Sequence, residues 1–142
     1  MRFKAKGLLV FTYLILSVAA SWADDPLEYQ LAVVDAGSRV PRDHITVARF
    51  RSLLDQLSKT FVEDRRQIAN MTVKARDILR EDGIQEKMLT MMEGMNKLFW
   101  KPIPNQKYAE YITMYVMLRK KGESHQEAIN DIASFLRSLG AH

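Results

Sequence analysis

The chain has 142 residues, a length that suits one domain with a sizeable buried core. It contains no cysteine, which excludes disulfide bonds, thiolate metal sites and cysteine nucleophiles. The formal net charge is +4, but three of the 21 basic residues lie within the first 23 residues, which contain no acid, so 18 basic residues remain against 17 acidic ones and no nucleic-acid partner is expected.

Residues 1–23 have the layout of a secretory signal peptide. The basic start "MRFKAK" precedes an uncharged apolar run over residues 7–20, and small residues follow at Ser21 and Ala23. The run is shorter than the roughly 20 apolar residues that a membrane-spanning helix needs. We therefore expect cleavage after Ala23, no stable membrane span in the mature chain, and export to the periplasm or beyond the cell.

Residues 24–43 form an N-terminal segment that precedes an α-helical domain expected over residues 44–142. Pro26 suits the first turn of a helix and Gly37 suits its end, which together predict a short helix. Within this segment "YQLAVV" has the composition of a strand. A single strand would have no partner for its hydrogen bonds, so a helix is favoured over a strand.

An arginine-rich stretch follows this segment. Residues 39–51 contain four arginines and one acid, whereas four acids stand between residues 24 and 35. The arginines either form a solvated face that pairs with those acids, or they form a docking surface for an anionic partner or lipid headgroup. The paired face is favoured, because isolated surface charges are common and individually weak.

Helical spacing of apolar residues dominates from His44 to Asp82, with Asp43 as the expected N-cap. Charged residues interrupt the apolar stripe near residues 64 and 65, and "TFVE" over residues 60–63 matches a capping box. The region is either one long helix or two helices that meet near residues 59–64. Two helices are favoured, because one helix would be more than twice as long as the next.

Gly83 is expected to end this region, and a further helix is expected over residues 84–100. Pro102 and Pro104 then break the chain, since each proline disfavours helical geometry in the residue before it. Asn105 is the expected N-cap of the helix that follows.

Two helices are expected at the end of the chain. The stretch "YAEYITMYVMLRKK" places cations in its last turn and Gly122 after it, which is typical of a helix C-terminus. Ser124 and Glu127 then match a capping box. The last helix is expected to bury Ala128, Ile129, Ile132, Phe135, Leu136 and Leu139. The sequence therefore predicts an all-α, single-domain bundle of four to six helices.

Four methionines, Met88, Met91, Met92 and Met95, occur within eight residues. On a helix they fall within an arc of about 100°, so their sulfur atoms could together bind a soft ion such as Cu(I). The apolar side chain of Ile84 falls in the same arc, however, and methionine fills irregular core spaces well. Core packing is therefore favoured, the metal site is the alternative, and no cofactor is expected.

No constellation in the sequence indicates catalysis. Ser124 stands beside His125, but the serine is explained as a cap, and no phosphate-binding, dinucleotide or metalloprotease motif occurs. We therefore expect a non-catalytic protein that binds another protein through exposed apolar residues such as Val116, Met117 or Trp100. The alternative is a carrier that holds a small apolar ligand or a soft metal in an interior lined by methionine and aromatic residues.

Overall fold

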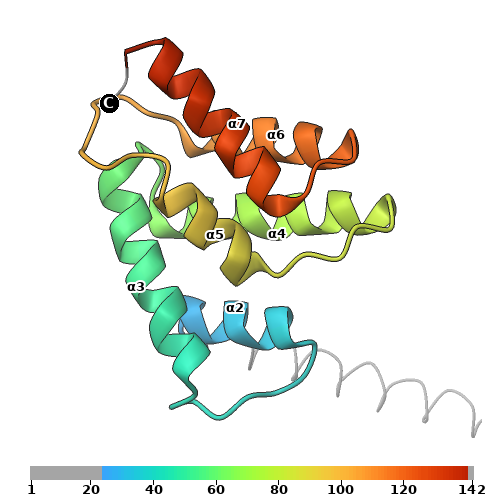
Figure 1. Cartoon of the computed structure of the whole chain (residues 1–142). Coiled ribbons are helices and arrows are strands. Elements are labelled where there is room, and N and C mark those ends of the chain that lie inside the picture. The colour runs from blue at the N-terminus through green and yellow to red at the C-terminus, as the bar shows by residue number, and fades with distance from the viewer. Residues whose placement is uncertain (1–23, 141–142) are drawn as a thin grey trace, which may run out of the picture.

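The computed structural model describes residues 24–140, so the expected signal peptide lies outside the described residues. Residues 24–140 form six α-helices and no strand, which confirms the predicted all-α bundle (Figure 1). In chain order the helices are α2 (Leu27–Ala36), α3 (Ile45–Thr60), α4 (Arg65–Glu81), α5 (Met88–Asn96), α6 (Tyr108–Lys120) and α7 (His125–Ser138).

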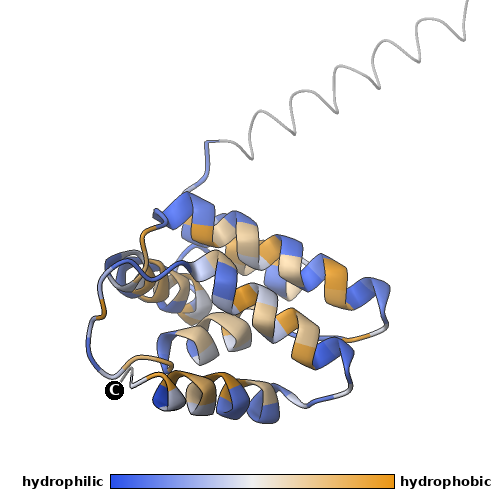
Figure 2. Cartoon of the chain, turned by 90° about the horizontal axis from the view of Figure 1, so that it is seen from above, coloured by the Kyte–Doolittle hydropathy of each residue, from blue (hydrophilic) through white to orange (hydrophobic). Residues whose placement is uncertain are grey.

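Three of the helices lie roughly parallel in a stack, in the order α2, α4 and α6 (Figure 1). Helix α3 runs across one end of this stack, and α5 and α7 cover one side of it. Helix α5 contacts α2, α3, α4 and α7, so it is the central element of the bundle. Six of its nine residues are buried. Figure 2 shows the apolar sides of the surrounding helices turned toward the interior.

The predicted break between residues 59 and 64 is confirmed, because α3 ends at Thr60 and α4 begins at Arg65. The capping residues differ from the expected ones. The carboxylate of Asp64 accepts a hydrogen bond from the amide of Gln67 at 2.8 Å, and the Gln67 side chain accepts one from the Asp64 amide at 2.9 Å. The predicted capping box began at Thr60, but Thr60 is the last residue of α3. The observed capping box begins four residues later, at Asp64.

The prediction that Asp43 caps α3 is wrong. His44 is the N-cap, and its Nδ1 atom accepts a hydrogen bond from the amide of Thr46 at 3.3 Å. Asp43 is therefore one residue too early, and its side chain is exposed. An imidazole nitrogen can replace the carboxylate oxygen at this position because both are hydrogen-bond acceptors two or three bonds from the backbone.

Helix α5 is shorter at both ends than the expected helix over residues 84–100. Its start is fixed from another part of the chain. The two carboxylate oxygens of Asp35, at the end of α2, accept hydrogen bonds from the amides of Met88 and Leu89 at 2.7 and 3.3 Å. These are amides of the first turn, which have no partner within the helix. The preceding residues are thus free to form the connection from α4.

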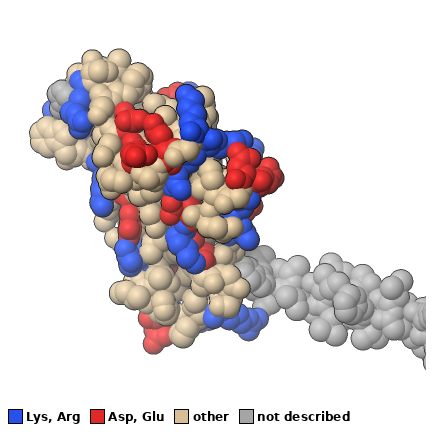
Figure 3. Space-filling model, turned by 45° about the vertical axis from the view of Figure 1, so that its right-hand side comes forward, with Lys and Arg blue, Asp and Glu red and all other residues tan. Residues whose placement is uncertain are grey.

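The arginine-rich stretch mainly forms ion pairs, as the favoured interpretation expects. Arg42 lies 2.5 Å from Asp25, Arg51 lies 3.0 Å from Glu28, and Arg49 pairs with Glu93. Figure 3 shows basic and acidic side chains interspersed over the face in view. Among residues 24–140, no helix is long and apolar enough to cross a bilayer.

The buried face of α7 is shorter than expected. Ala128, Ile129, Ile132 and Leu136 are buried, but Phe135 and Leu139 are exposed, so their predicted burial is wrong. The expected capping box of α7 is confirmed, since Ser124 accepts from the Glu127 amide at 3.2 Å and Glu127 accepts from the Ser124 amide at 2.9 Å.

Candidate protein-binding groove

An apolar groove of about 450 Å³ lies between α4 and α6, which pack side by side. The buried stripe of α4 faces the core, and Met71 and Ile78 lie half-buried at the edge of that stripe. From α6 the groove receives Val116, which is buried, and Met117, which is 56% exposed. The groove is lined by Met71, Lys74, Ala75, Ile78, Ala109, Ile112, Thr113, Val116, Met117 and Lys120.

The charged residues that line this groove have one sign. Its lining contains Lys74 and Lys120 and no carboxylate. Lys120 reaches Asp82 at 3.4 Å, but both side chains are more than 40% exposed, so this pair is weak and readily exchanged for another partner. The groove therefore combines an apolar floor with a cationic rim.

Two contacts fix α6 relative to α4 and thus set the geometry of the groove. The hydroxyl of Tyr108, at the start of α6, lies 2.8 Å from the hydroxyl of Thr72 in α4, and both residues are fully buried. The carboxylate of Glu63 accepts hydrogen bonds from the amides of Tyr108 and Ala109 at 2.7 and 3.1 Å. A negative charge at a helix N-terminus also interacts favourably with the helix dipole.

The predicted N-cap of α6 is therefore wrong. Asn105 lies outside the helix with a φ of 62°, a left-handed conformation that asparagine tolerates better than most residues. The N-cap position is Lys107, whose side chain forms no capping hydrogen bond. Glu63 performs this role from a site 45 residues earlier. The sequence analysis did not predict this role of Glu63, because it considered only caps that lie next to the helix in the sequence.

The four methionines of α5 all lie in the core, and their side chains are fully buried. They pack in the cluster that also contains Phe50, Leu54 and Ile132. The burial is what the packing interpretation of the methionine stripe expects. We predict that the sulfur atoms bind no soft metal.

A polar network joins α6, α7 and the connection before α5. Arg119 forms an ion pair with Glu86 and donates a hydrogen bond to the hydroxyl of Tyr115 at 2.9 Å. The same hydroxyl lies 2.8 Å from Nδ1 of His125. Burial raises the pKa of Tyr115 to about 12, and burial lowers the pKa of His125.

This network is typical of structural support for a helix junction. Each member is held by another member. Tyr115 and Arg119 lie one turn apart on α6, while His125 is the first residue of α7. The network therefore fixes the angle between α6 and α7, which leaves the opposite side of α6 to form the groove.

The three residues expected in an exposed apolar patch lie in two different places. Met117 is exposed in the groove, and Val116 beside it is buried in the groove floor. Trp100 is exposed on the loop between α5 and α6, and it is not among the groove residues. The sequence analysis did not identify Met71, Lys74 or Ile78, because the side of α4 that meets α6 depends on tertiary packing.

Comparison with known protein families gives a match. The sequence matches the MoxZ family over residues 35–135, which cover all the groove residues. Since the match extends over more than half of the chain, the protein belongs to the MoxZ family. No curated protein and no solved structure matches. Family membership fits a small accessory protein, and it assigns no reaction, ligand or partner.

Proposed function

We propose that this MoxZ-family protein is a non-catalytic accessory protein, and that it binds another polypeptide in the groove between α4 and α6. The observation that carries the proposal is the groove itself, which has an apolar lining and a rim that contains lysines and no acid. Exposed Met117 would be covered by the partner. Large apolar side chains exposed in a concave site are typical of interaction surfaces.

The partner expected from this chemistry is an amphipathic helix with acidic flanks. Helices commonly bind by laying an apolar face into a groove formed by two other helices. Carboxylates on the partner would pair with Lys74 and Lys120, while apolar side chains would contact Met71 and Met117. Methionine suits such a site because its flexible, polarisable side chain adapts to the shape of the occupant.

Export is part of the proposal. The basic start, the apolar run over residues 7–20 and the small residues before Asp24 support secretion, so the partner is expected in the periplasm or outside the cell. The alternative of a carrier with its ligand in the bundle interior has less support. The methionines that would form that site are fully buried among core side chains.

Affinity purification of the exported protein from its own compartment tests the proposal. We expect a polypeptide to be retained by the wild type and lost with Met117→Glu, because the new carboxylate would meet the acidic flank of the partner and would place a charge in the apolar interface. The fold should tolerate this change, since Met117 is more than half exposed. Mass spectrometry identifies the retained polypeptide.

Ile45→Glu is the matched control. Ile45 is also a large exposed apolar residue, but it lies at the start of α3 and outside the groove. The control should retain the polypeptide. Equal loss in both variants, or retention in both, would show that the groove is not the binding site. A small apolar ligand or copper in the purified wild type, without any polypeptide, would favour the carrier.

A further inference from the structure

Exposed apolar side chains gather at one end of the bundle, away from the groove. Among residues 24–140, six large hydrophobic side chains are exposed, and four of them belong to this end. These four are Val62 (58% exposed), Trp100 (76%), Phe135 (48%) and Leu139 (66%). We refer to them together as the end surface. The other two, Ile45 and Met117, lie elsewhere.

Three segments that are distant in the sequence form this surface. The amide of Val62 donates to the carbonyl of Gln106 at 2.9 Å, so the α3–α4 connection lies against the loop that carries Trp100. Helix α7 returns antiparallel to α6 after a short turn, so its last residues lie near the start of α6 and the same loop (Figure 1).

The two α7 residues are exposed although this helix is still covered by the bundle on its core side. Leu136, in the same turn as Phe135, is only 3% exposed, so Phe135 lies at the edge of the buried stripe. Phe135 follows Ala128 by seven residues, or about two turns, and therefore points to nearly the same side of α7. Ala128 is fully buried, whereas Phe135 is about half exposed. Leu139 continues the stripe one turn later. The apolar face of α7 is thus wider than the part that packs on the core, and Phe135 and Leu139 remain exposed.

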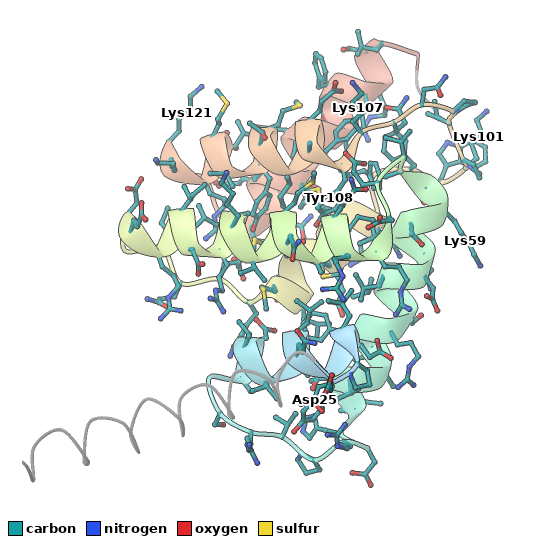
Figure 4. The ribbon with its side chains drawn as sticks, turned by 180° about the vertical axis from the view of Figure 1, so that it is seen from behind. Asp25, Lys59, Lys101, Lys107, Tyr108 and Lys121 are labelled. Atoms are coloured by element: carbon teal, nitrogen blue, oxygen red, sulfur yellow. The ribbon has the colours of Figure 1, made fainter. Side chains whose placement is uncertain are left out.

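Cations surround these apolar side chains. Lys59, Lys101 and Lys107 project away from this end of the bundle (Figure 4). Residues 94–109 contain three lysines and no acid, and residues 132–140 contain one arginine and no acid. The ammonium group of Lys101 lies 5.0 Å from the centre of the Trp100 ring. The indole ring and the positive charge therefore lie next to each other on this surface.

These lysines differ from the arginines near the N-terminal end of the bundle. Those arginines pair with Asp25, Glu28 and Glu93. Lys59, Lys101 and Lys107 form no ion pair with any residue in the described range. The end surface thus has three lysines beside it that are available to an anionic partner.

We propose that the end surface docks the protein on an anionic lipid bilayer. Trp100 and Phe135 enter the headgroup region, and the three lysines contact lipid phosphates. Tryptophan is suited to this depth because its ring is apolar and its N–H is polar, and lysines near an anionic bilayer add attraction. The end surface is a set of projecting side chains from three segments. A bilayer can accept such a set without the shape complementarity that a protein partner needs.

Vesicle co-sedimentation of the purified protein tests this proposal. We expect binding to vesicles made of equal parts of phosphatidylglycerol and phosphatidylcholine, and little binding to phosphatidylcholine alone. Replacing Lys59, Lys101 and Lys107 together by glutamine should weaken binding roughly hundredfold, since each lysine near an anionic surface contributes about fivefold. Trp100→Ser should weaken it roughly tenfold through loss of apolar insertion.

Two variants serve as controls. Lys121→Gln removes a lysine from the opposite end of the molecule (Figure 4), and Met117→Glu disrupts the groove. Both variants should bind anionic vesicles as the wild type does. The proposal for the end surface can therefore be contradicted without contradicting the proposal for the groove, and the reverse. Absence of binding to anionic vesicles overturns the proposal. So does binding that Lys121→Gln weakens, or binding that persists in Trp100→Ser and in the triple glutamine variant.

Discussion

Met92 shows how a sequence motif that suggests metal chemistry can belong to the core. Its side chain is fully buried at the centre of the methionine stripe. Met92→Leu keeps volume and apolarity, so it should lower the free energy of unfolding by less than about 1.5 kcal/mol. Met92→Ala leaves a cavity and should lower it by about 2–5 kcal/mol. Urea denaturation of the two variants measures both values. Equal and small losses would show that the site is loosely packed.

His125 makes stability dependent on pH. Burial lowers its pKa, with Arg119 and Lys97 acting in the same direction and Glu86 opposing them. Its folded-state pKa therefore lies below the unfolded value of about 6.5. Below that pH the unfolded chain binds the proton more readily, so stability falls as the pH decreases through this range.

Denaturant midpoints at about pH 7.5 and about pH 5 measure this contribution. The wild type should lose stability at the lower pH. His125→Gln cannot take up a proton at this site, so its loss between the two pH values should be smaller. An identical loss in both proteins would assign the acid sensitivity to other groups.

At the scale of the elements, α6 depends on a carboxylate from a distant part of the chain. Glu63 is buried and accepts hydrogen bonds from two amides in the first turn of α6. Glu63→Ala leaves one buried and one partly buried amide without a partner, and it should lower the free energy of unfolding by about 1–3 kcal/mol. Glu110→Ala is the control, because Glu110 lies in the same first turn but is exposed.

Glu110→Ala should lower the free energy of unfolding by less than about 1 kcal/mol, which is the usual size of a charge effect at a helix terminus. Thermal or denaturant unfolding of the two variants gives the comparison. If both substitutions lower the free energy of unfolding equally, the two hydrogen bonds that Glu63 accepts would add nothing beyond its charge.

Local patterns were sufficient to predict most helices and one capping box. Ser124 and Glu127 lie three residues apart, so their pairing depends only on the chain near them. Asp35 and Glu63 cap helices more than 40 residues away, and no local pattern could identify them. The error at Asn105 has this cause, because Glu63 satisfies the first amides of α6 from a distance. The error at Asp43 is a local one, because the cap is the next residue, His44.

The candidate groove could be predicted only in part for the same reason. Met117 was expected to be exposed, and it is. Its neighbours in the groove come from α4, and the sequence spacing does not reveal that α4 packs beside α6. Likewise, Phe135 is exposed although the neighbouring Leu136 is buried, because Phe135 lies at the edge of the side of α7 that packs on the core. The helical period alone assigns this residue to the buried face.

At the scale of the whole molecule, the bundle has two separate surfaces with different chemistry. The groove is concave and lined by apolar side chains from α4 and α6, with Lys74 and Lys120 at its rim. The end surface projects from loops and from the end of α7. A protein that used both surfaces would hold its partner at a bilayer. The two proposals nevertheless rest on different residues.

The central claim is that the groove binds a polypeptide, and site-specific photocrosslinking tests it most directly. A photoreactive amino acid at position 117 places the probe in the groove, and one at position 45 places it on an equally exposed apolar site elsewhere. In cells that make the protein, we predict a discrete crosslinked polypeptide from position 117 and none from position 45. The account is contradicted if position 117 gives no polypeptide adduct, or if both positions give the same one.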